Sequence, residues 1–174
     1  TDETVFTAGA YAYSTYEFQW TAGIIVSGTC KQVNQATDCA DTAGNSVRIA
    51  VNGTLRASTD SVVDGAWSIA GVATPVTDDI LTLFIEGEAA SSSQAVTVTK
   101  YNGSGDVTGV ELLEAHLSIG SDQRNTITNV NLSQYDSSVS VKRTFHDVSG
   151  TTLTVDVDAA VAGEELYVKG GNTY

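Results

Sequence analysis

Several residue types that signal a particular function are scarce or missing in this 174-residue chain. It has no methionine, one proline, two cysteines, two histidines and eight lysine or arginine residues against 21 acidic ones. No apolar run approaches the ~20 residues that span a bilayer, which excludes a membrane-spanning helix and a secretory signal from these residues. The formal net charge of −13 repels phosphate backbones and anionic lipids. We therefore expect neither nucleic acid nor a membrane as a partner.

The scarcity of histidine bears on catalysis. His116 follows Glu114 closely and His146 precedes Asp147, but no Gly-Xaa-Ser-Xaa-Gly elbow is present to hold a nucleophilic serine near either ring. Neighbours on a strand point to opposite faces, so His146 and Asp147 are not expected to act together. We interpret both histidines as partly exposed strand residues. The sequence predicts no enzyme and no cofactor.

What the chain does contain is a series of short strand-like runs. Apolar and polar residues alternate over residues 46–51, and Asn52-Gly53 then forms a tight hairpin turn. A polar loop is expected after Leu55, closed by Asp64-Gly65. Residues 80–85 are apolar on both faces, which is typical of a central strand. The expected core comprises Val47, Ile49, Val51, Trp67, Ile69, Leu81, Leu83 and Ile85.

The last third of the chain continues the pattern. Apolar residues occupy every second position from Leu113 to Ile119, which predicts one long strand that bridges two packed units. Four further strand-like runs follow, at residues 126–132, 137–145, 151–157 and 165–169. Helical spacing is weak throughout, and a brief turn at residues 158–162 is the one helical candidate. These runs form either a second small β unit or an extension of the first sheet.

The two cysteines flank a polar insertion. Cys30 and Cys39 allow one intrachain bridge, and closure of a loop of about ten residues removes roughly 2.7 kcal/mol of unfolded-chain entropy. A metal or redox pair would need Cys-Xaa-Xaa-Cys spacing or a nearby histidine. The spacing therefore predicts a disulfide and an oxidising compartment.

Three motifs carry a resemblance to a known family. They are Ile24-Ile25-Val26-Ser27-Gly28-Thr29, then Gly44-Asn45-Ser46-Val47-Arg48-Ile49, then Asp60 with Asp64-Gly65-Ala66-Trp67-Ser68-Ile69. Over residues 24–115 this pattern resembles the carboxypeptidase-regulatory-like or Cna-B-like domain. The family's Asp-Gly-Xaa-Pro turn is replaced here by Thr42-Ala43-Gly44-Asn45.

The resemblance implies an all-β fold, an antiparallel β-sandwich of Ig-like or prealbumin-like type. Such domains are stalk and spacer modules of secreted and cell-surface proteins. We expect an N-terminal strand segment at residues 1–22, the sandwich at residues 23–116, and a C-terminal β unit at residues 117–174.

The segment before the sandwich is rich in aromatic side chains. Tyr11 and Tyr13 share one parity and Tyr16, Phe18 and Trp20 the other, so a strand here needs a bulge near residues 14–15. It could be an ordinary edge strand, a strand donated to a neighbouring subunit, or a sugar-stacking face. The expected subunit contacts are Val5, Phe6, Tyr11, Tyr13, Tyr16, Phe18 and Trp20.

Two surface features are compatible with an extracellular protein. Asn52, Asn102 and Asn131 begin glycosylation sequons, which also arise by chance in a chain so rich in serine and threonine. Carboxylates cluster in five places, and none fits the EF-hand loop. Loop carboxylates together with backbone carbonyls can bind Ca²⁺, so Ca²⁺ is the candidate metal ion, without assigned ligands. These clusters are Asp38 with Asp41, Asp60 with Asp64, Asp78-Asp79, Asp156 with Asp158, and Glu164-Glu165.

Together these features favour a secreted or cell-surface structural protein. A chain that starts Thr1-Asp2-Glu3 is most simply a mature secreted form or an excised fragment. We expect a subunit or repeat of a filament, stalk or adhesin, with copies of itself or neighbouring repeats as partners. The alternative is a carbohydrate-binding module that uses Tyr11, Tyr13, Tyr16 or Trp20.

Overall fold

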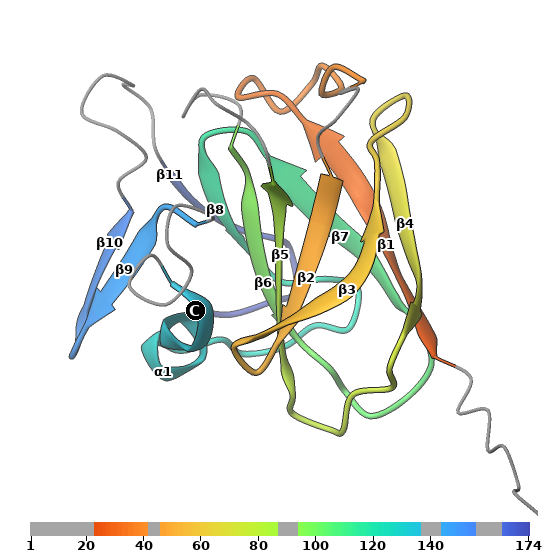
Figure 1. Ribbon diagram of the computed structural model, residues 1–174. Helices are drawn as coiled ribbons and strands as arrows, with labels where there is room; N and C mark the ends of the chain where they lie inside the picture. The colour runs from red at the N-terminus through yellow and green to blue at the C-terminus, as the bar shows by residue number, and fades with distance from the viewer. Residues whose placement is uncertain (1–22, 42–45, 87–93, 137–143, 156–164) are drawn as a thin grey trace, which may run out of the picture.

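A computed structural model describes residues 23–41, 46–86, 94–136, 144–155 and 165–174, and it confirms an all-β sandwich (Figure 1). A six-stranded sheet has the order β11-β8-β6-β5-β2-β3 and a three-stranded sheet the order β4-β1-β7. The strands are β1 (Ile24–Lys31), β2 (Ser46–Val51), β3 (Thr54–Asp60), β4 (Ala66–Val72), β5 (Ile80–Glu86), β6 (Val96–Lys100), β7 (Val107–Leu113), β8 (His116–Ile119), β9 (His146–Ser149), β10 (Thr152–Val155) and β11 (Glu165–Val168).

The sandwich is mixed and not purely antiparallel. Strands β1 and β7, β6 and β8, and β8 and β11 pair in parallel. Parallel neighbours need a crossover connection, and two of the three lie between strands of the six-stranded sheet. The chain leaves β6, runs through β7 in the other sheet, and returns as β8. It then passes through α1 (Asn129–Leu132), β9 and β10 before it returns as β11.

The central strand and its hairpin partner match the sequence expectation. Every residue of β5 except Glu86 is buried, and β5 lies between β2 and β6. Asn52, at φ 45°, and Gly53, at φ 74°, form the turn from β2 to β3. The expected polar loop after Leu55 begins later than predicted, because residues 54–60 form the edge strand β3. The turn at Asp64-Gly65 that closes the loop is confirmed, with φ angles of 49° and 69°.

Two apolar layers cover opposite faces of the six-stranded sheet (Figure 1). The first lies between the two sheets and contains all eight residues expected in the core. The second lies between the six-stranded sheet and a cover made of α1, the 3₁₀ turn Ser133–Tyr135 and the β9–β10 hairpin. Phe84 of β5 stacks on Tyr135 there, with ring centroids 5.6 Å apart.

The C-terminal strands extend the first sheet. Strands β8 and β11 belong to the same six-stranded sheet as β5, so the expected boundary between residues 116 and 117 falls within a sheet. The expected long strand from Leu113 to Ile119 is wrong. The chain turns at Ala115, whose φ is 59° and whose N–H donates to the Gln94 carbonyl, and so moves from one sheet to the other.

The expected strand at residues 126–132 is also wrong, because residues 129–132 form α1. Thr128 and Asn131 make a reciprocal capping box at its start. The 158–162 turn and most of the 137–145 run lie outside the described residues. In the described part of the chain, none of the helices has the length and apolar content needed to cross a bilayer.

Candidate functional site: the disulfide end and the sheet edges

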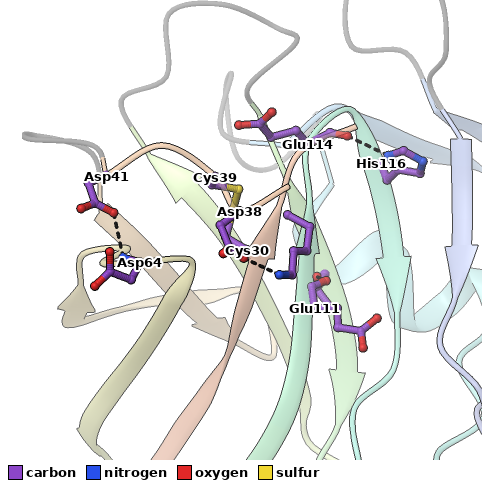
Figure 2. The surroundings of a disulfide bond; sticks show 10 residues. Cys30, Asp38, Cys39, Asp41, Asp64, Glu111, Glu114 and His116 are labelled. Atoms are coloured by element: carbon purple, nitrogen blue, oxygen red, sulfur yellow. Dashed lines mark hydrogen bonds and ion pairs between the residues drawn. A yellow bond between two sulfur atoms is a disulfide. The ribbon is translucent and has the colours of Figure 1, made fainter. Parts of the chain in front are cut away.

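The predicted disulfide closes one end of the sandwich. Cys30 and Cys39 are buried, with Cα atoms 5.4 Å apart. Figure 2 shows Asp38 next to this bridge, and the Asp38 carboxylate forms an ion pair with the Lys31 ammonium. The loop is further tied down because the Asp41 carboxylate accepts from the Asp64 N–H at 2.8 Å. The bridge therefore joins the end of β1 to the loop that follows it, and the Asp41–Asp64 hydrogen bond holds that loop against the turn before β4.

Loss of this bridge should weaken the fold measurably. We expect the double variant Cys30→Ser, Cys39→Ser to lower the free energy of unfolding by about 2.7 kcal/mol, because the unfolded chain regains the loop entropy. Urea unfolding of oxidised, reduced and variant proteins measures this. Reductant should destabilise the unmodified protein and leave the double variant unchanged. If reductant destabilised both proteins equally, the disulfide would not be the cause of the loss.

Carboxylates of the expected Ca²⁺ clusters are engaged with the backbone. Asp60 accepts from the Ser68 N–H at 2.6 Å, and Asp79 accepts from the Val76 N–H at 2.8 Å and the Asn52 amide at 2.6 Å. Asp78 has φ 73°, as a turn residue does. The described residues contain no group of three or more His, Cys, Asp or Glu able to hold a metal ion. Asp156, Asp158 and Glu164 lie outside the described residues.

Both histidines are buried, so the expectation of partial exposure is wrong. His116 of β8 bonds through Nδ1 to the Glu114 carbonyl at 2.7 Å, and its Nε2 lies 3.9 Å from the Glu165 carboxylate. His146 of β9 bonds through Nε2 to the Leu132 carbonyl at 3.2 Å. Its Nδ1 has no hydrogen-bond partner in the described structure. Burial lowers the pKa of His146 against the weaker opposing effects of that bond, Asp136 and Asp147.

This histidine predicts a loss of stability in mild acid. Above pH 6.5 the His146 ring is neutral in both the folded and the unfolded chain, so its titration takes nothing from the free energy of unfolding. Below pH 6.5 the unfolded chain binds a proton that the folded chain refuses, so the free energy of unfolding falls by up to about 1.4 kcal/mol per pH unit until the lowered pKa is reached. Urea unfolding at pH 7.5, 6.5 and 5.5 measures the slope. His146→Gln, which can still donate to Leu132, should remove most of it, and an unchanged slope would contradict this assignment.

A polar pocket of about 210 Å³ lies beside β7 and β11. Its lining comprises Thr29, Lys31, Gln35, Glu111, Leu113 and Tyr167. The Lys169 ammonium donates to Glu111 at 2.8 Å, and this bond raises the pKa of Lys169 although burial alone would lower it. Burial and the Glu111 charge raise the pKa of Tyr167. Both ionised residues of the lining are thus engaged with residues outside it, Glu111 with Lys169 and Lys31 with Asp38.

The two sheets of the sandwich end in four strands, β3 and β11 in the larger and β4 and β7 in the smaller, and β9 and β10 pair as a separate two-stranded sheet. A sheet edge offers unpaired N–H and C=O groups to another strand. The four edge strands differ in side chains and in backbone hydrogen bonding, and the sequence pattern alone did not indicate which of them is open to another strand. The signal that was available is the apolar pair Leu166 and Val168, which interrupts an otherwise polar C-terminal stretch.

The remaining predicted sites are placed as follows. Asn52 and Asn102 are exposed in turns, and Asn131 is half-buried in α1, where its carboxamide oxygen accepts from Thr128. The expected subunit contacts between Val5 and Trp20 lie outside the described residues. A scan against protein-family models gives no match, and a search of curated proteins finds no similar sequence.

Proposed function

We propose that this chain is an extracellular structural protein, a subunit or repeat module of a cell-surface filament, stalk or adhesin. Copies or neighbouring repeats associate by β-strand pairing or strand donation. The observation that carries the proposal is an all-β sandwich that has edge strands on both sheets and contains a disulfide. Main-chain groups at a sheet edge give affinity for an added strand, and side-chain pockets give it specificity.

Other features support the same reading. The disulfide persists in an oxidising exterior, and the net charge of −13 favours solubility without attraction to nucleic acid. The Cna-B-like pattern of residues 24–115 is typical of modules that space other domains away from a surface. Residues 4–20 supply a strand-length segment that precedes the sandwich.

The test is assembly with and without the N-terminal segment. We expect the full chain to form multimers or filaments in light scattering and electron microscopy, and the chain that lacks residues 1–20 to stay monomeric, because the donated strand is gone. The matched control keeps the length and replaces Tyr16, Phe18 and Trp20 with serine, and it should also fail to assemble.

Two outcomes would contradict the proposal: a full chain that is monomeric at every concentration, or unchanged assembly of the truncated chain. The same measurement with EDTA tests the acidic loops, because dissolution of the assembly by EDTA would assign Ca²⁺ a role in it. Indifference to EDTA would leave strand pairing as the sole basis of assembly.

A further inference from the structure

Edge strand β11 completes an apolar row that crosses the six-stranded sheet. Cross-strand partners face the same side, and Leu166 pairs with Leu117 and Val168 with Ile119. Leu117 and Ile119 are fully buried in the second apolar layer, whereas Leu166 and Val168 are each 37% exposed. The row therefore reaches the border of the sheet, beside β8 in Figure 1, and its last members stay in contact with solvent.

The backbone of β11 is equally open. Glu165 N–H donates to the Ala115 carbonyl and Lys169 N–H to the Ile119 carbonyl, so the odd residues of this strand bond toward β8. In a regular ladder the alternate residues, Leu166 and Val168, direct their N–H and C=O groups away from β8. These are the same two residues that present the exposed apolar side chains.

The other three edges of the two sandwich sheets carry obstacles to an added strand. Strand β3 has a register shift against β2 between Arg48 and Ala50, which is typical of protected edges. In β4 the Ser68 N–H is already occupied by the Asp60 carboxylate. In β7 the carbonyls of Thr108 and Glu111 accept from the Asp122 N–H at 3.0 Å and the Thr97 hydroxyl at 2.5 Å.

We propose that β11 is the acceptor edge and that residues 4–20 of a second copy add to it as a strand. This inference rests on the proposed function and specifies where the donated strand lies. Tyr16, Phe18 and Trp20 share one parity, so a strand paired with β11 carries all three on one face, and in one of its two registers this is the face of Leu166 and Val168. Residues 4–22 contain one charged residue, Glu17, so they approach an acidic partner with little repulsion.

Hydrogen exchange of the assembled and the diluted full-length chain tests the location. In the assembly the amides of Leu166 and Val168 should exchange at least tenfold more slowly than in the monomer, while those of β3 and β4 keep their rates. Assembly with new protection at β3 or β4 overturns the choice of β11 and leaves the proposed function standing. Protection of β11 that does not depend on concentration overturns the second copy as donor.

A pair of charge variants completes the test. Leu166→Lys with Val168→Lys should raise the concentration needed for assembly at least tenfold, because two ammonium groups would lie among the donated aromatic side chains. The control, Ala57→Lys with Thr59→Lys, adds the same charge to exposed positions of β3. It should change the concentration needed for assembly less than twofold. Thermal unfolding of both variants verifies that each is folded. Equal effects of the two pairs would overturn the assignment, and failure of the unmodified chain to assemble would overturn the proposed function itself.

Discussion

Replacement of Gly28 with alanine is expected to lower the free energy of unfolding by more than about 4 kcal/mol, a large part of the stability of a domain this size. Gly28 lies in β1, where it pairs with Trp67 of β4 and Val110 of β7. A Cβ at this position would lie 1.8 Å from the Val110 carbonyl oxygen and 2.8 Å from the Trp67 ring. The nearest obstacle is backbone, so β1 and β7 would have to separate.

The matched control for this variant is Gly170→Ala. Gly170 has no heavy atom within 4 Å of an added Cβ and its φ lies outside the left-handed region. Alanine there should leave stability unchanged or raise it by about 0.5 kcal/mol through the unfolded chain. Urea unfolding followed by tryptophan fluorescence measures both variants, and a loss below about 1 kcal/mol for Gly28→Ala would contradict the close approach of β1 and β7.

The second large effect is expected at Phe84, which is fully buried in the second apolar layer. Phe84→Ala removes the ring that stacks on Tyr135 and should lower the free energy of unfolding by about 3–5 kcal/mol. Because the layer joins β5 to α1 and the β9–β10 hairpin, the whole described fold should still unfold in one transition. Phe84→Leu, which keeps most of the apolar volume, should lose much less.

Two probes distinguish one cooperative unit from two. Fluorescence of Trp67 reports on the layer between the sheets, and exchange of the β9 and β10 amides reports on the cover of the opposite face. Coincident urea midpoints for the two probes in Phe84→Ala are the expected result. Separate transitions, with β9 and β10 lost first, would show that residues 117–174 behave as a unit of their own.

Local patterns in the sequence predicted the elements whose cause is local. The alternation of Val47, Ile49 and Val51, the Asn52-Gly53 turn and the doubly apolar run at residues 80–85 correspond to β2, its hairpin and the central strand β5. The cysteine spacing predicted the disulfide. Each of these depends on side-chain period, turn conformation or chain proximity within a few residues.

Other features could not be predicted in this way, because their causes are long-range. Residues 126–132 have strand-like composition, yet residues 129–132 form a helix that covers the sheet. The polarity of the residues after Leu55 indicates a loop, but pairing with β2 makes residues 54–60 a strand. His116 and His146 are polar in sequence and buried in the fold, because β8 is an inner strand of the six-stranded sheet and β9 packs over that sheet.

By itself, then, the sequence determined an all-β class, an inner strand, a disulfide and an acidic surface, because composition, period and spacing are local properties. Tertiary structure alone decided that β8 and β11 extend the first sheet, that three strand pairs are parallel, and that Leu166 and Val168 stand at an open edge. Strand order depends on which distant segments meet across crossovers, and no pattern within one strand records its neighbour.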